Sequence, residues 1–142
     1  MEFNQYNTTV QQWIHTVLEN RETNADVVLE CCRDIIAYGR ETDDPKLMGF
    51  GFFYGGEIYY ELNDGAHFFH MMTEALTYLD RAEEWELVVR CYNFLGRQYH
   101  IEVSGDDYYI DILMYNTFLH RYLVIELINS LLVVSRKYGR SL

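Results

Sequence analysis

The sequence predicts an all-α protein, a right-handed solenoid of helical hairpins with about seven helices. Two observations support this prediction. Apolar residues recur at helical spacing along nearly the whole chain, as at Val10, Ile14 and Val17. Positions forty residues apart also match, and forty residues is the length of one two-helix unit that buries its apolar face by stacking on its neighbours.

The first three predicted helices have clear local signals. Val10, Ile14 and Val17 lie on one apolar stripe, which predicts the first helix. Asn24, or Thr23 before it, can cap a second helix over 24–40. Asp44 followed by Pro45 is a strong start signal for a third helix, which runs to about residue 62.

The remaining four helices are predicted between turn-forming sequences. Asn63-Asp64-Gly65 ends the third helix, and Ser104-Gly105-Asp106 is expected to separate the fifth from the sixth. The predicted ranges are 66–80, 83–101, 107–119 and 122–138. The last helix is apolar around much of its circumference, so we expect a longer chain or self-association to cover it.

The forty-residue echo is clearest in the second helix of each hairpin, where Val28, Phe68 and Tyr108 begin three matching apolar stripes. The first helices share an aromatic residue, a glycine and a tyrosine: Phe52, Gly56 and Tyr59 in one copy, Tyr92, Gly96 and Tyr99 in the other. A glycine at this position lets two helices approach closely. The repeat therefore predicts the scaffold better than it predicts a site.

Composition narrows the function classes. Eleven Lys and Arg against 22 Asp and Glu give a formal net charge of -11, which argues against nucleic acid and acidic membranes as partners. Three cysteines without metal-ligand spacing, no signal sequence and no apolar run of bilayer length predict a cytoplasmic protein. No linker is visible, so residues 1–142 are expected to form one domain, part of a longer protein.

The aromatic, glycine and tyrosine pattern resembles the tetratricopeptide repeat, over roughly residues 24–138. Two family positions depart from it: Phe68 and Tyr108 stand where a small residue is usual, and Asp80 and His120 where the repeat closes with proline. The chain also resembles, more loosely, the helical input regions that precede GGDEF diguanylate cyclase domains in bacterial signalling proteins. Both resemblances imply a regulatory, protein-binding domain in bacterial signal transduction.

In tetratricopeptide repeats the first helices line a groove, and this resemblance places Glu57, Tyr60 and His100 among the groove residues. Arg90, Asn93 and Arg97 follow at i, i+3 and i+7, which puts two guanidinium groups and an amide on one stripe. Such a stripe can grip a carboxylate through charge-assisted hydrogen bonds. The alternative is a solvated face on which the arginines pair with nearby carboxylates.

Other candidate sites have simpler interpretations. His67, His70 and Glu74 share a helix face and could ligate a metal, but a surface or packing role is favoured and no metal is predicted. Cys31 and Cys32 are adjacent, and burial as small apolar residues is favoured over redox chemistry. The sequence shows no phosphate-binding glycine loop and no hydrolase motif, and no cofactor is predicted.

The sequence therefore predicts a non-catalytic recognition or sensory module that binds a peptide, a partner protein or a small ligand. One alternative is a structural module that self-associates, with a possible homodimer through the last helix. Another is a small helical enzyme with a polar pocket between repeats.

Overall fold

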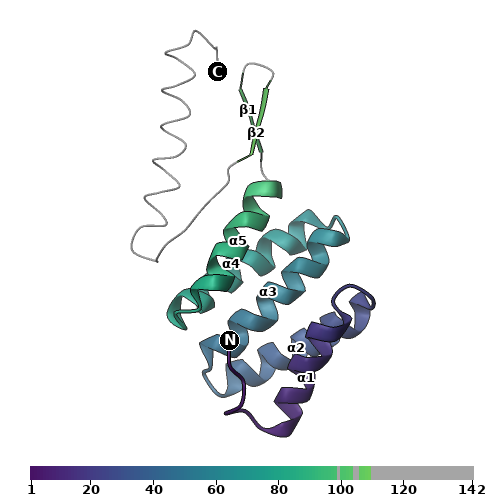
Figure 1. The fold of residues 1–142 in the computed structure, drawn as a ribbon, viewed down its shortest axis with the longest axis vertical. Coiled ribbons are helices and arrows are strands. Elements are labelled where there is room, and N and C mark those ends of the chain that lie inside the picture. The colour runs from purple at the N-terminus through teal and green to yellow at the C-terminus, as the bar shows by residue number, and fades with distance from the viewer. Residues whose placement is uncertain (99, 104–105, 110–142) are drawn as a thin grey trace. The chain divides into compact units, whose positions relative to one another are not determined.

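The computed structural model describes residues 1–98, 100–103 and 106–109 (Figure 1). It contains five helices and a two-stranded antiparallel ladder: α1 (Thr8–Asn20), α2 (Ala25–Glu41), α3 (Pro45–Glu61), α4 (Gly65–Arg81), α5 (Trp85–Gln98), β1 (His100–Val103) and β2 (Asp106–Tyr109). The chain divides into two compact units, Met1–Val88 and Val89–Leu142.

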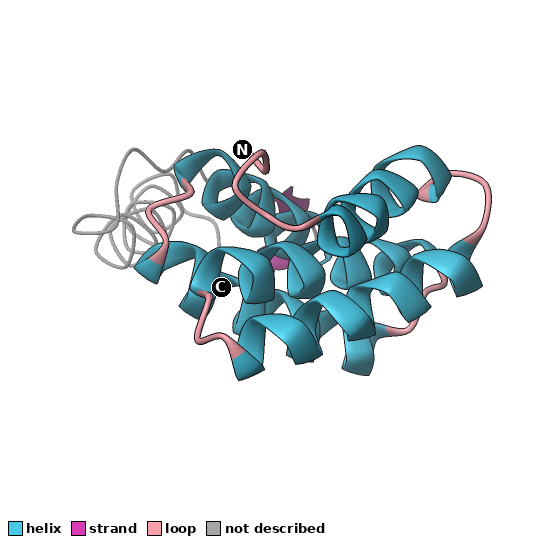
Figure 2. Cartoon of the chain, turned by 90° about the horizontal axis from the view of Figure 1, so that it is seen from below, coloured by secondary structure: helices cyan, strands magenta, loops and turns pink. Residues whose placement is uncertain are grey.

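Within Met1–Val88, successive helices pack side by side. α2 lies against α1 and α3, and α3 also lies against α4 (Figure 2). The prediction of a helical protein is confirmed for α1 to α4, and the bounds of α2 to α4 lie within a few residues of the expected ones. Among the described residues, no helix is long and apolar enough to cross a membrane.

One turn geometry recurs every twenty residues and joins these helices. The backbone N–H of Asp44 donates to the Gly39 carbonyl, and that of Asp43 donates to the Arg40 carbonyl. The same two bonds recur at residues 63–64 and 83–84. This is the Schellman ending, in which the residue after the helix cap adopts a left-handed conformation.

The residue that closes one helix also begins the next. The side chain of Asp44 accepts a hydrogen bond from the Leu47 N–H at 3.1 Å, and that of Asp64 accepts one from the His67 N–H at 3.1 Å. These carboxylates satisfy donors that the first turn of a helix leaves unpaired. The predicted start at Asp44 and Pro45 is confirmed.

α3 is the central helix of the Met1–Val88 unit. All twelve residues from 47 to 58 are buried, so this helix has almost no polar face. Glycine makes room for both neighbours: a Cβ at Gly49 would lie 2.6 Å from Leu79 Cδ2 on α4, and one at Gly51 would lie 2.6 Å from Ile36 Cγ1 on α2. Gly56, predicted to allow close helix approach, would similarly meet Met72.

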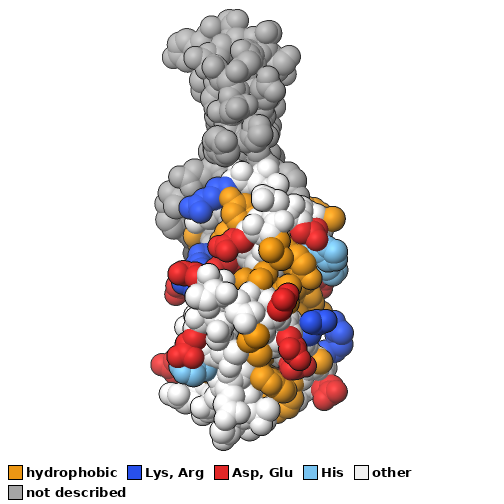
Figure 3. Space-filling model, turned by 90° about the vertical axis from the view of Figure 1, so that its right-hand side faces the viewer, with side chains coloured by type: hydrophobic (Ala, Val, Ile, Leu, Met, Phe, Trp, Pro, Cys, Tyr) orange, Lys and Arg blue, Asp and Glu red, His pale blue; other side chains and the backbone are white. Residues whose placement is uncertain are grey.

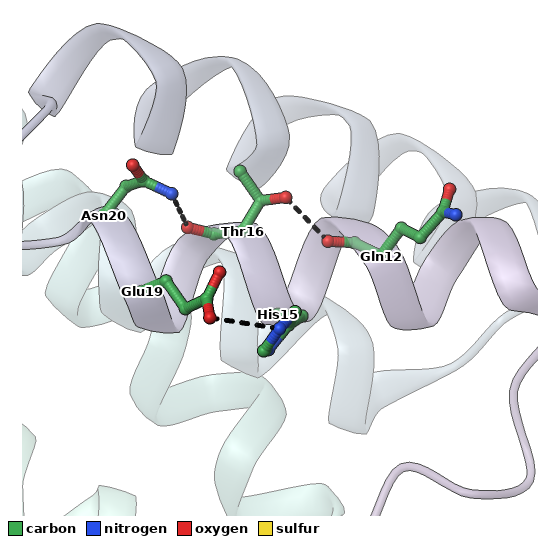
Figure 4. Close-up of polar contacts among 5 residues, drawn as sticks. All are labelled: Gln12, His15, Thr16, Glu19 and Asn20. Atoms are coloured by element: carbon green, nitrogen blue, oxygen red, sulfur yellow. Dashed lines mark hydrogen bonds and ion pairs between the residues drawn. The ribbon is translucent and has the colours of Figure 1, made fainter.

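α1, by contrast, is polar on its outer side (Figure 4). Thr16 Oγ1 donates to the Gln12 carbonyl and Asn20 Nδ2 to the Thr16 carbonyl, each at 2.8 Å. His15 Nε2 lies 3.1 Å from Glu19 Oε1 one turn on. Its inner side carries the predicted apolar stripe of Val10, Ile14 and Val17, whereas Leu18 is 41% exposed.

The predicted helices beyond α4 need correction. α5 ends at Gln98 rather than near residue 101, and β1 follows it. The sixth helix was expected to begin at Asp107, which instead lies in β2 and pairs with Glu102. The rest of that helix, and the whole of the helix expected at 122–138, lie outside the described residues.

The physical reason lies in the sequence 100–109. β-Branched and aromatic residues flank Ser104-Gly105, a combination that favours two short strands with a two-residue connection. The forty-residue repeat led to the prediction of a helix in this segment. The prediction was wrong because apolar residues three or four positions apart also occur by chance in strands rich in aromatic residues. Tyr108 therefore does not begin a third helical stripe.

Gly51→Ala should destabilise the protein by about 1–3 kcal/mol, because the added methyl group meets the Cys32 carbonyl oxygen at 3.0 Å as well as Ile36. Gly65→Ala is the matched control, since nothing lies within 4 Å of its Cβ position. It should be neutral or stabilising by up to about 1 kcal/mol. Urea denaturation of both variants measures the difference, and equal stability would contradict the close approach of α2 and α3.

Glu83→Gly should stabilise the protein by about 0.5–1 kcal/mol. Glu83 has φ of 57°, a left-handed conformation that costs free energy for a residue with a Cβ. Asn63→Gly, at a φ of 55°, should stabilise the protein less than Glu83→Gly does, because asparagine tolerates this conformation. Thermal unfolding checks both, with Glu83→Ala as the control that keeps the strain.

Candidate functional site

α5 brings together three of the predicted site residues. Arg90, Asn93 and Arg97 lie on this one helix at the predicted spacing. Arg90 and Asn93 are half-buried, whereas Arg97 is exposed in its last turn. The two arginines are separated by about 10 Å along the helix axis, from a rise of about 1.5 Å per residue.

Asn93 supplies a polar atom that is buried without a partner. Its amide oxygen Oδ1 has no hydrogen-bond donor among the described residues. A buried amide oxygen without a donor is uncommon, because it loses its hydrogen bonds to water on burial. The Asn93 side chain as a whole is half-buried, so its amide oxygen is an unpaired acceptor below the surface of the stripe.

His100 does not continue the stripe. It is the first residue of β1, after the helix has ended at Gln98. The expectation that it lies on the same helix as Arg97 is wrong for this reason. A three-residue step along a helix places side chains on one face, and that rule does not extend into a strand.

Glu57 and Tyr60 lie on α3, in the Met1–Val88 unit, whereas Arg90, Asn93, Arg97 and His100 belong to Val89–Leu142. Glu57 is only 9% exposed, and its carboxylate lies 3.8 Å from Arg21 Nη1. Tyr60 is half-buried, with its ring 5.4 Å from that of Phe68. A common site for all six residues stays a prediction.

Phe50 and Phe53, which precede Glu57 at helical spacing on α3, are core residues. Phe50 and Phe53 are 1% and 0% exposed. In the part of the chain that the structure describes, a groove occurs on another side of α3, where Phe52 and Tyr59 line it together with residues of α2 and α4.

The surface of the described residues is mixed rather than uniformly acidic. On the face seen in Figure 3, hydrophobic side chains form a band beside acidic, basic and histidine side chains. Leu62 caps α3 and is 56% exposed, and Phe69 on α4 is 50% exposed. Apolar and charged groups are thus both available at the surface.

His67 and His70 have partners within the protein. His67 Nδ1 lies 2.7 Å from Asp64 Oδ2, and its ring stacks on that of Tyr59. The His70 ring meets that of Phe52 edge to face. Within the described ranges, no three His, Cys, Asp or Glu side chains form a group that could hold a metal ion.

The cysteines are free thiols. Cys32 is 1% exposed, which confirms its prediction as a small buried apolar residue, and Cys31 beside it is half-buried. Burial raises the pKa of the Cys32 thiol far above its usual range. A thiol held in its neutral form is a poor nucleophile.

One protein-family model matches this chain. Residues 79–139 match the family described as the YhcG PDDEXK nuclease domain, a segment that covers less than half of the 142 residues. No curated protein and no solved structure matches significantly.

This similarity corrects several predictions. The resemblance to tetratricopeptide repeats and to GGDEF input regions is wrong, as is the assignment to signal transduction and regulation, because the matching family is a nuclease domain. It also overturns the expectation of a non-catalytic recognition or sensory module that is not an enzyme. The exclusion of nucleic acid as a partner is overturned as well.

The argument from net charge failed because it averaged over two unlike units. Met1–Val88 holds 17 of the carboxylates and five of the cations, a formal charge of -12. Val89–Leu142 holds five carboxylates and six cations, a formal charge of +1. Because electrostatic attraction is local on the scale of the Debye length, about 8 Å, the second unit does not repel a polyanion.

The pH dependence of the α4 cap provides a test of the His67 contacts. The backbone N–H of His67, with a smaller contribution from its side chain, lowers the pKa of the Asp64 carboxyl. The ionised cap therefore stabilises the fold above the unfolded pKa of about 3.9, and this contribution is lost as the pH falls through the lower folded pKa.

His67→Ala should raise the Asp64 pKa but leave it below its usual value, because the backbone donor remains. Carbon-detected NMR titration of the Asp64 carboxyl measures this shift. An unchanged pKa would contradict the contact between His67 Nδ1 and Asp64. Asp64→Asn is the control, since it should remove this acid-side loss of stability.

Proposed function

We propose that this chain cleaves phosphodiester bonds of nucleic acid through its C-terminal part, as an enzyme of the nuclease class. The observation that carries the proposal is the match of residues 79–139 to a nuclease domain family. The near-neutral charge of Val89–Leu142 supports it, because this unit concentrates six of the eleven cations of an acidic chain.

Arginine is the residue that would bind the phosphate. The letters PDDEXK in the family's name, read as one-letter residue codes, end in a carboxylate, one free position and a lysine. The matched segment holds a single lysine, Lys137, and Ser135 stands two positions before it, so that spacing does not occur there. Balancing the charge of a phosphodiester therefore falls mainly to arginine, whose planar group donates two parallel hydrogen bonds to phosphate.

Arg90 and Arg97 are the arginines of this segment that the structure describes within Val89–Leu142. They share a face of α5 with Asn93, whose amide completes a stripe of groups suited to a sugar-phosphate backbone. Contacts of this kind position a strand and carry no sequence preference. We therefore propose that this stripe binds an anion, as the sequence predicted, but that the anion is a phosphate of nucleic acid and not the carboxylate of a peptide.

Carboxylates are the other requirement, because hydrolysis needs a group that accepts a proton from the attacking water or orients a cation beside it. Glu102 and Asp107 are paired directly opposite each other in the β1–β2 ladder. We assign them as the candidate acid and base positions, and we derive no step through a metal.

Cleavage by the full chain tests the proposal. Labelled single-stranded and double-stranded DNA and RNA are incubated with the protein in Mg²⁺, in Mn²⁺ and in a chelator, and the products are separated by electrophoresis. We expect cleavage of at least one substrate, and at least a hundredfold loss in Glu102→Gln or Asp107→Asn. Absence of cleavage with every substrate would contradict the proposal.

Arg97→Ala should weaken nucleic-acid binding and lower the slope of log affinity against log salt by about one, because one phosphate contact is lost. Arg81→Ala is the matched control. It also removes one exposed arginine, but Arg81 pairs with Asp43 within Met1–Val88. An equal effect of the two substitutions would show that overall charge, rather than the α5 stripe, governs binding.

A further inference from the structure

The groove of Met1–Val88 has no role in the function proposed above. Its volume is about 540 Å³, within the range of small-molecule sites. Arg33 and Arg40 of α2 line one wall, Phe52 and Tyr59 of α3 lie between, and His70 and Glu74 of α4 line the opposite wall. Three consecutive helices therefore contribute cationic, aromatic and acidic groups to one hollow.

The two arginines of this groove differ from every other cation of their unit. Arg21 pairs with Glu57 and Glu22, Lys46 with Glu84, and Arg81 with Asp43. Arg33 and Arg40 make no ion pair with a carboxylate of the described residues, although this unit holds 17 of them. Arg33 Nε donates to the Leu29 carbonyl at 3.4 Å, which helps to fix its side chain along α2.

The aromatic rings of the groove are held in place by neighbours. The Tyr59 ring stacks on His67 at 4.8 Å between centroids, with an interplanar angle of 19°. The Phe52 ring stacks on Tyr78 at 5.7 Å, with an angle of 5°. Each lining ring is therefore backed by a second ring, which reduces the entropy lost when a planar ligand stacks against it.

We propose that this groove binds a phosphorylated nucleoside, either free or at the end of a single strand. The phosphate lies against Arg33 and Arg40, which donate charge-assisted hydrogen bonds to it. The base stacks on the free side of the half-buried Tyr59 ring, and Glu74 accepts hydrogen bonds from the sugar hydroxyls or an exocyclic amine. His70 is a further donor on the facing wall.

The charge of the unit selects a small ligand over a long one. A duplex would extend past the groove into a surface whose formal charge is -12, and its many phosphates would be repelled. A mononucleotide presents its charge only at the groove, where screening limits the repulsion from more distant carboxylates. All of its contacts belong to Met1–Val88, so this inference does not depend on phosphodiester cleavage.

Calorimetric titration of the full chain with AMP, GMP, CMP and UMP tests the inference, beside adenosine, inorganic phosphate, a 5′-phosphorylated single strand and a duplex. We expect at least one mononucleotide to bind at least tenfold more tightly than adenosine and than phosphate. The duplex should bind the Met1–Val88 unit no more tightly than adenosine or phosphate does. Stronger binding of the 5′-phosphorylated strand than of AMP, if Arg33→Ala and Arg40→Ala abolish the difference, would identify a strand end as the ligand of the groove. Tighter binding of a glutamate-rich peptide than of any nucleotide would overturn the assignment.

Arg33→Ala and Arg40→Ala should each weaken nucleotide binding about tenfold, since each removes hydrogen bonds to a charged group. Arg81→Ala removes one exposed arginine outside the groove and should change the affinity for the nucleotide less than twofold. Tyr59→Leu should weaken nucleotide binding about fivefold and leave phosphate binding unchanged. Equal affinity in the Arg33, Arg40 and Arg81 variants would overturn the inference.

The same variants separate this inference from the proposed nuclease function. Arg33→Ala and Arg40→Ala should leave cleavage of a long strand unaffected. Nucleotide binding that depends on these arginines, in a chain without cleavage, would support the groove and contradict the nuclease proposal. Cleavage by a chain that binds no mononucleotide would support the nuclease proposal and contradict nucleotide binding in the groove.

Discussion

α3 is covered on both sides, by α2 and by α4, and the close approach of these helices depends on glycine at its surface. A helix with twelve consecutive buried residues leaves little space for side chains at each contact. Gly49 and Gly51 therefore face Leu79 and Ile36 at distances that no Cβ would tolerate. The groove depends on this packing, because its aromatic residues Phe52 and Tyr59 belong to the same helix.

The recurring turn sets the spacing of the stack. The left-handed residues Asp43, Asn63 and Glu83 are twenty positions apart, and after the first two the next residue caps the following helix with its carboxylate. One short sequence thus ends a helix, reverses the chain and begins the next helix. α2, α3 and α4, each 17 residues long, pack against one another in succession. The forty-residue repeat in the sequence corresponds to two of these twenty-residue spacings.

The two units differ in charge as well as in structure, and this bears on function. Carboxylates crowd Met1–Val88, whereas Val89–Leu142 is close to neutral and contains the β1–β2 ladder and most of the nuclease-like segment. A polyanionic strand would meet the second unit with less repulsion than the first. In the acidic unit, the local excess of arginine at the groove favours a small anion instead.

The sequence by itself determined the four helices of Met1–Val88. Apolar spacing and caps such as Asp44 are local, so they act before any tertiary contact forms. It also placed Arg90, Asn93 and Arg97 on one helix, because three and seven residues are whole helical turns. Only the tertiary structure decided which faces are buried: Phe50 and Phe53 became core, while Phe52 and Tyr59 line a groove. It also decided that residues 100–109 pair as strands, because cross-strand contacts, which local periodicity does not register, override helical spacing.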